Sequence, residues 1–154
     1  MPKRREWSDL IKRGIMAISP VYKKGIGDIT IVKLEDEEII IERNIKTVLN
    51  NIAKFFLLDL TESRRYYSQY LDKKKNIPMV YNGDNIYIVV KTRNPIGKND
   101  GAMSYVNSRY ISGVKDGIIS YRNGDSLKTF TSDKTIKRNM KDVQYILQDL
   151  EIRM

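Results

Sequence analysis

The chain has 154 residues, 41% of them hydrophobic, and a formal net charge of +9; this length and composition predict one folded, basic domain with a sizeable core. It contains neither Cys nor His, which excludes disulfides, thiol nucleophiles, thiolate zinc sites and catalytic triads with a His base. No apolar run approaches the ~20 residues of a membrane-spanning helix, so we expect a cytoplasmic protein with no membrane segment.

The first third of the chain is predicted to begin with a polar segment and to continue as strands. Residues 1–13 are expected to form a basic N-terminal arm or a short helix around Trp7, ahead of a main domain over residues 14–154. Segments rich in β-branched residues predict strands. In chain order, we expect a short strand at 14–20, a strand at 28–34, an acidic turn at 35–38 and a strand at 39–41.

A helix is predicted in the middle of the chain. Asn44 is a suitable N-cap for a helix over 45–60, whose apolar residues recur at three- and four-residue spacing. The segment 61–70 is predicted to be a second helix or an ordered loop. A basic connector at 73–75 follows it. No helix is expected to continue to Pro78, because proline disfavours helical backbone in the residue before it.

The second half of the chain changes to a strand-like pattern and ends in a helix. We expect strands at 79–81 and 85–91 joined by an Asn-Gly turn, a polar loop at 92–102, and a meander of strands at 108–114, 117–122 and 126–132. Ser132 is expected to cap a final helix with Ile136, Val143 and Leu150 on its apolar face. The predicted fold is a single α+β domain with a mainly antiparallel, curved sheet, one central helix and one C-terminal helix.

The positive charge is concentrated in the middle and later part of the chain. Residues 61–141 contain 16 Lys and Arg against seven Asp and Glu, whereas residues 1–60 contain 11 against nine. A polyanion is the natural partner of such a surface, because neutralised phosphates release condensed counterions. We therefore expect these cations to gather on one side of the folded protein and to bind nucleic acid there.

The densest cluster of basic and aromatic residues lies directly after the predicted central helix. Arg64 and Arg65 are followed by Tyr66, Tyr67 and Tyr70. Guanidinium groups hold phosphates, and tyrosine hydroxyls can hydrogen-bond backbone oxygens of a nucleic acid. The same pattern also fits an amphipathic helix with solvated arginines and half-buried tyrosines, and the sequence leaves both interpretations open.

Four further cations are candidate DNA contacts. Lys74 and Lys75 belong to the basic connector, and Arg93 and Lys98 lie in the polar loop at 92–102. An Arg or Lys entering a narrow A/T-rich minor groove would meet a concentrated negative potential there. Ordinary solvated loops are the alternative. We expect no catalytic, cofactor-binding or metal-binding residue, because no convincing pair of carboxylates lies on neighbouring predicted strands to hold magnesium.

Several short motifs in the middle of the chain follow one another in the order found in one known family. They are Phe55-Phe56, the segment Arg64-Arg65-Tyr66-Tyr67-Ser68, then Lys75 to Val80, Asn85 to Val90, Ser104-Tyr105-Val106-Asn107, and Ile118 to Tyr121. This order resembles the ComK family, the competence transcription factors of Gram-positive bacteria. One departure is Tyr105, which stands where that family usually has a tryptophan.

The resemblance implies a ComK-like DNA-binding domain over residues 14–154 and a function as a transcriptional activator. The expected partner is double-stranded A/T-rich DNA, approached largely from the minor groove by a homodimer or a pair of dimers. Composition and spacing by themselves predict only a basic, non-enzymatic, nucleic-acid-binding domain. Three alternatives remain: a module that binds RNA or DNA with little sequence choice, a small metal-dependent nuclease, and a protein-interaction regulator whose basic surface binds an acidic partner.

Overall fold

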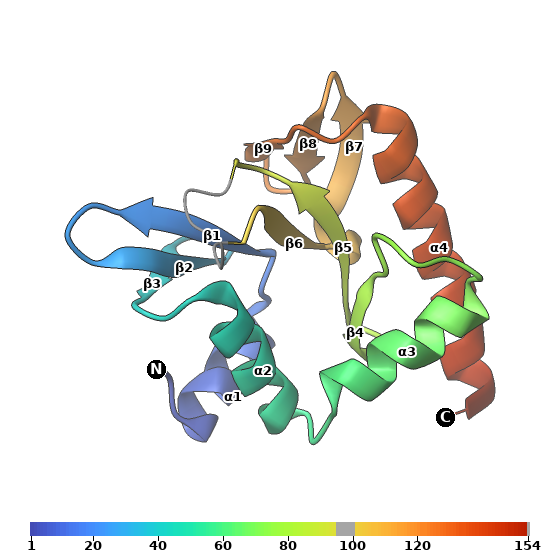
Figure 1. Ribbon diagram of the computed structural model, residues 1–154, viewed down its shortest axis with the longest axis horizontal. Helices are drawn as coiled ribbons and strands as arrows, with labels where there is room; N and C mark the ends of the chain where they lie inside the picture. The colour runs from blue at the N-terminus through green and yellow to red at the C-terminus, as the bar shows by residue number, and fades with distance from the viewer. Residues whose placement is uncertain (95–100, 154) are drawn as a thin grey trace.

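The computed structural model describes residues 1–94 and 101–153. Within these ranges the chain forms a single α+β domain with a six-stranded antiparallel sheet, a three-stranded antiparallel sheet and four α-helices (Figure 1). The predicted fold class is confirmed, including the C-terminal helix. Two helices rather than one stand in the middle of the chain, and a further helix lies near its start.

The helices and strands have the following bounds. The first half contains α1 (Arg4–Arg13), β1 (Ala17–Lys23), β2 (Gly27–Lys33), β3 (Glu38–Ile41), α2 (Ile45–Phe55) and α3 (Leu60–Tyr70). The second half contains β4 (Met79–Asn82), β5 (Asn85–Lys91), β6 (Met103–Asn107), a 3-10 helix (Ser108–Tyr110), β7 (Ile111–Lys115), β8 (Ile118–Tyr121), β9 (Ser126–Lys128) and α4 (Asp133–Arg153). In Figure 1, α1 and α2 lie at the lower left, α4 runs down the right side, and β7, β8 and β9 stand at the top.

The six-stranded sheet has the strand order β3-β2-β1-β6-β5-β4, so β6 joins the two halves of the chain. This strand was not among the predicted strands, because buried polar residues interrupt its apolar pattern. The hydroxyl of Ser104 is fully buried and lies 2.9 Å from the Ser19 hydroxyl and 2.6 Å from the Thr92 hydroxyl. Such long-range partners satisfy a buried polar group, but they are invisible in the local sequence.

Two apolar clusters pack on opposite faces of this sheet, and β5 contributes to both. Tyr87 belongs to the cluster that contains α1 and α2 residues, whereas Ile86, Ile88 and Val90 belong to the cluster that contains α4 residues. Successive side chains of a strand point to opposite faces of the sheet. β5 is therefore covered on both faces, which explains its continuous apolar run.

The helix predicted over 45–60 ends earlier, at Phe55, and the segment 61–70, predicted as a second helix or an ordered loop, is a helix that begins at Leu60. The Asn44 side chain accepts a hydrogen bond from the Thr47 N–H at 2.9 Å, which confirms the predicted N-cap. The helix α2 ends at Phe55 because Leu57 adopts a left-handed backbone conformation with φ of 59°. Asp59 then caps α3 by accepting from the Glu62 N–H at 3.1 Å, so the chain turns without a long loop.

The predicted meander is correct in its turns, but its first strand begins later than predicted and its last strand ends at Lys128 rather than at 132. Residues Ser108–Tyr110 form a 3-10 turn, and β7 begins only at Ile111. Strands β7, β8 and β9 pair in sequence as an antiparallel sheet. The hydroxyl of Ser132 accepts from the Thr135 N–H at 3.2 Å, in agreement with the predicted cap of the final helix.

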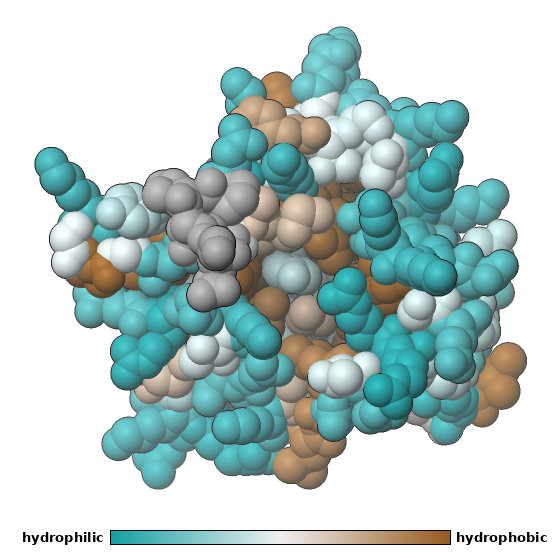
Figure 2. Space-filling model, viewed as in Figure 1, coloured by the Kyte–Doolittle hydropathy of each residue, from teal (hydrophilic) through white to brown (hydrophobic). Residues whose placement is uncertain are grey.

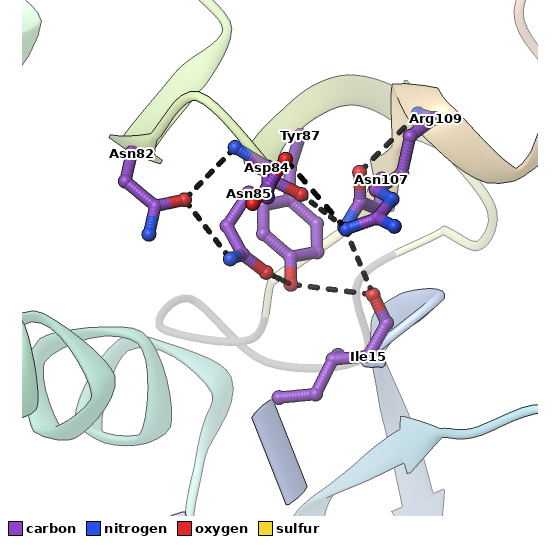
Figure 3. Close-up of polar contacts among 7 residues, drawn as sticks. All are labelled: Ile15, Asn82, Asp84, Asn85, Tyr87, Asn107 and Arg109. Atoms are coloured by element: carbon purple, nitrogen blue, oxygen red, sulfur yellow. Dashed lines mark hydrogen bonds and ion pairs between the residues drawn. The ribbon is translucent and has the colours of Figure 1, made fainter. Parts of the chain in front are cut away.

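A polar network holds the tight turn between β4 and β5 against the segment before β1 (Figure 3). A tight turn was predicted here, but Asn82 still pairs with Asn85, so the two turn residues are Gly83 and Asp84 rather than Asn82 and Gly83. The side-chain oxygen of Asn82 accepts a hydrogen bond from the Asp84 N–H at 3.0 Å. The Asn107 amide group donates to the carbonyls of Ile15 at 3.1 Å and Asp84 at 3.3 Å. Burial raises the pKa of Tyr87, whose hydroxyl lies 3.3 Å from the Ile15 carbonyl and remains a donor.

Candidate nucleic-acid interface

The densest group of cations on one element lies along α4. Lys134, Lys137, Arg138 and Lys141 are all exposed and stand at positions i, i+3, i+4 and i+7, so they lie along one side of the helix. We call these four residues the α4 stripe. They face solvent because the opposite side of α4 is apolar and packs on the sheet through residues such as Ile136.

Three of the four acidic side chains of α4 have partners outside the stripe. Asp133 accepts hydrogen bonds from the backbone N–H groups of the turn between β7 and β8, at 2.9 and 2.7 Å. Asp142 forms an ion pair with Lys73 at 2.7 Å, and Asp149 forms one with Arg153 at 2.9 Å. Among residues 1–94 and 101–153, no ion pair involves a member of the α4 stripe. Its positive charge is therefore available to an external anion.

The loop between α3 and β4 borders the stripe. Lys73 Nζ lies 2.7 Å from the Asp142 carboxylate and 3.3 Å from the Asn139 side-chain oxygen, and these contacts hold the loop against α4. Lys74, one of the predicted DNA contacts, follows directly and is exposed. We call the α4 stripe together with Lys74, which follows the residue that anchors this loop on α4, the basic surface.

A second feature, the central cleft, lies between α2 and α3 above β5 and β6 and has a volume of about 950 Å³. Figure 2 shows this hollow near the middle of the view, with apolar residues at its base and hydrophilic residues around it. The predicted DNA contacts Arg64 and Lys75 line the cleft, together with Lys46 from α2. The structure thus separates the predicted residues: Lys74 lies on the basic surface, and Arg64 and Lys75 lie in the cleft.

The aromatic residue of the cleft is Tyr105 on β6. It stands opposite Val89 of β5 in the sheet, and both residues line the cleft. Burial raises the pKa of Tyr105, although the nearby positive charge of Arg64 works in the opposite direction. The phenol group is therefore neutral near pH 7 and can donate a hydrogen bond into the cleft.

Arg93 is held inside the protein. Its guanidinium forms an ion pair with Asp28 at 2.6 Å and donates to the Gly101 carbonyl at 2.7 Å. The two charged side chains are only 16% and 10% exposed. A guanidinium held in this way is not presented to a minor groove, so we leave Arg93 out of the proposed DNA contacts. Lys98, its predicted partner in the same loop, lies outside the described residues.

The basic and aromatic cluster of α3 is divided between solvent and the interior. Arg65 is exposed and pairs with Glu62 at 2.9 Å within its own helix. The tyrosines instead connect α3 to α4: the Tyr66 hydroxyl donates to Asp149 at 2.8 Å, and the Tyr67 hydroxyl lies 3.3 Å from the same carboxylate. The tyrosines therefore match the interpretation of half-buried packing residues.

Replacement of Asp149 by asparagine is expected to lower the free energy of unfolding by about 1–3 kcal/mol at pH 7, because charge-assisted hydrogen bonds are lost. Burial works against ionisation of this carboxyl group, but hydrogen bonds from Tyr66, Arg153 and Tyr67 outweigh it and lower the pKa of Asp149. Because the pKa of Asp149 is lower in the folded than in the unfolded protein, ionised Asp149 stabilises the fold at pH values above the ordinary carboxyl pKa. This stabilisation is lost as the pH falls through the pKa of the folded state.

Chemical denaturation at pH 7 and at pH 3 measures this linkage. The difference between the wild type and Asp149→Asn should be present at pH 7 and should shrink progressively below about pH 4, as the carboxyl group becomes protonated first in the unfolded and then in the folded state. Glu151→Gln, an exposed change on the same helix, serves as the control and should have little effect. An equal difference at both pH values would show that the charge of Asp149 is unimportant.

Two groups of candidate residues were missed by the sequence-based prediction. The α4 stripe is visible in the sequence as cations at helical spacing opposite the predicted apolar face, and this signal could have identified it. Lys46 gave no such signal, because its place in the cleft depends on where α2 lies relative to α3. The α4 stripe could therefore be found from local sequence spacing, whereas the place of Lys46 depends on the tertiary fold.

The described residues contain no group of three or more acidic side chains that could hold a metal ion. No helix within residues 1–94 and 101–153 is long and apolar enough to cross a membrane. No protein-family model matches this chain, and neither the curated proteins nor the solved structures give a significant match. Residues and geometry of this chain, together with the ComK resemblance, are therefore the basis for a functional proposal.

Proposed function

We propose that the protein is a ComK-like, DNA-binding transcriptional regulator that holds duplex DNA by its phosphates through the basic surface. The observation that carries this proposal is the α4 stripe, whose four cations are exposed on one helix face. Phosphates neutralised by such a face release counterions, and this release supplies most of the affinity of non-specific DNA binding. The cytoplasm is the proposed location.

The dimensions of the stripe suit a DNA groove. From Lys134 to Lys141 an α-helix rises by roughly 10 Å, which lies between the ~6 Å width of the minor groove and the ~12 Å width of the major groove. Long Lys and Arg side chains at these positions have the reach to contact phosphates on both sides of a groove. The preference for A/T-rich boxes, the minor-groove approach and the dimeric state come from the ComK resemblance alone and form part of the proposal.

A fourfold variant tests the basic surface. Replacing all four residues of the α4 stripe with alanine should make the plot of log binding constant against log salt concentration less steep by about 3–4, since each lost phosphate contact contributes roughly 0.9. Alanine is the best helix former, so α4 is expected to remain folded. Fluorescence anisotropy with labelled duplex DNA between 50 and about 300 mM salt measures the slope.

A matched control removes four cations from the rest of the surface. Lys12, Lys23, Lys24 and Lys54 are exposed and take part in no ion pair among the described residues, and changing them to alanine lowers the net charge by the same amount. This variant should keep a slope close to that of the wild type. If both variants flatten the slope equally, net charge rather than the basic surface binds DNA, and the proposed interface is wrong.

Competition experiments separate regulation from unspecific binding. An A/T-rich duplex should displace the labelled DNA at lower concentration than a G/C-rich duplex of equal length, because narrow A/T-rich minor grooves concentrate negative potential. Single-stranded RNA should compete least. Equal competition by all three nucleic acids would favour the alternative of a module that binds nucleic acid without sequence choice.

A further inference from the structure

The central cleft lies over β5 and β6 on the face of the six-stranded sheet that α2 packs against, with α3 beside the edge strand β4. Residues of α2 pack in the cluster with β1 and β2 residues, whereas α3 lies against β4. Between the two helices, Val89, Met103 and Tyr105 of β5 and β6 form the floor of a cleft of about 950 Å³. Pockets for small ligands have volumes of about 300–1,000 Å³.

The walls of the cleft carry positive charge without compensation. Lys46, Arg64 and Lys75 line it, and none of them takes part in an ion pair within residues 1–94 and 101–153. Asp28 is the acidic residue of the lining, and its carboxylate is already paired with Arg93. A ligand that neutralises the walls is therefore an anion.

The floor of the cleft is apolar, so a ligand that fits it also has an apolar group. Met79, Val89 and Met103 present aliphatic or thioether surface, and Tyr105 adds an aromatic ring with a hydroxyl donor. Covering such a surface removes apolar area from water, which is favourable, whereas a bare inorganic anion leaves it exposed. Three cations above an apolar floor are complementary to a molecule with a charged head and an apolar body.

We propose that the central cleft binds a small amphipathic organic anion. Its carboxylate or phosphate group lies at Lys46, Arg64 and Lys75, and its apolar body covers the floor at Val89 and Met103. This site is separate from the basic surface on α4, and the proposal does not depend on DNA binding. The two proposals are tested with different variants and different ligands, so either one can fail without the other.

Amide chemical shifts of the isotope-labelled protein test the ligand class. Octanoate and octyl phosphate should each give saturable shifts at cleft residues, with a dissociation constant of about 1 mM or tighter, and the stronger of the two identifies the preferred head group. Octan-1-ol, which has the same chain without charge, should bind about tenfold more weakly or worse. Inorganic phosphate, which lacks the apolar body, should give no saturable shift in the cleft.

Two double variants with the same loss of charge test the position of the head group. Lys46→Ala with Arg64→Ala removes cleft cations from α2 and α3, and should weaken octanoate binding about tenfold or more. Lys54→Ala with Arg65→Ala removes a Lys and an Arg from the same two helices outside the cleft, and should leave octanoate binding unchanged. Tyr105→Phe tests the hydroxyl donor while it keeps the ring.

Three results would overturn the proposal. Equal affinity for octanoate and octan-1-ol would show that the cleft cations do not recognise the charge. Equal weakening by the two double variants would show that only the overall charge of the protein matters. The absence of saturable shifts with both amphipathic anions, in a protein whose amide spectrum shows that it is folded, would show that the cleft is not a site for this class of ligand.

Discussion

Replacement of Trp7 by alanine is expected to lower the free energy of unfolding by about 3–5 kcal/mol, the range measured for large buried aromatic residues. Trp7 is only 1% exposed and belongs to the apolar cluster that includes α2 residues. Its indole N–H also donates to the Asn51 side chain at 2.5 Å. The substitution removes this packing and leaves the Asn51 oxygen without its partner, so α1 is expected to detach from α2.

Urea denaturation followed by circular dichroism measures this effect. Arg5→Ala, an exposed change in the same helix, is the control and should change the unfolding free energy by less than about 0.5 kcal/mol. A loss below about 1 kcal/mol for Trp7→Ala would mean that residues 1–13 act as a loosely attached basic arm. The change in unfolding free energy therefore distinguishes a helix packed on α2 from a loosely attached basic arm.

The parts of the fold that the sequence predicted well are those set by local chemistry. The Asn44 cap, the tight turn between β4 and β5 and the apolar face of α4 each depend on residues within a few positions of one another. The early end of the helix predicted over 45–60 was missed, because an apolar residue, Leu57, takes the left-handed conformation that usually marks Gly or Asn.

The parts that the sequence did not predict depend on long-range contacts. Strand β6 contains polar residues whose partners lie on β1 and near the end of β5, so its local pattern is not that of a buried strand. The same limit applies to the candidate sites. Helical spacing indicates the α4 stripe, but the central cleft is formed by segments that are distant in sequence and meet only in the folded sheet.

The loop between α3 and β4 connects the two candidate sites. Lys73 anchors the loop on α4, Lys74 follows it beside the α4 stripe, and Lys75 lines the central cleft. Three consecutive lysines therefore have three different environments, one in an ion pair, one on the basic surface and one in the cleft. The sequence prediction treated them as one basic connector, because a run of like residues carries no information about the side on which each one lies.

Replacement of Arg93 by alanine is expected to lower the free energy of unfolding by about 3–5 kcal/mol, because it leaves the Asp28 carboxylate buried without its partner. The pair is 2.6 Å apart and joins β2 to the segment after β5. The double variant Arg93→Ala with Asp28→Ala removes the stranded charge and should recover part of the lost stability. Thermal and urea denaturation of the three proteins measures both effects.

The same variant decides whether Arg93 contacts DNA. At a temperature where Arg93→Ala remains folded, its salt dependence of DNA binding should equal that of the wild type, because its guanidinium is occupied by Asp28 and the Gly101 carbonyl. A flatter salt dependence together with an unchanged unfolding free energy would contradict this. Arg93 would then leave Asp28 to reach a phosphate, and the polar loop at 92–102 would return to the DNA interface as the sequence predicted.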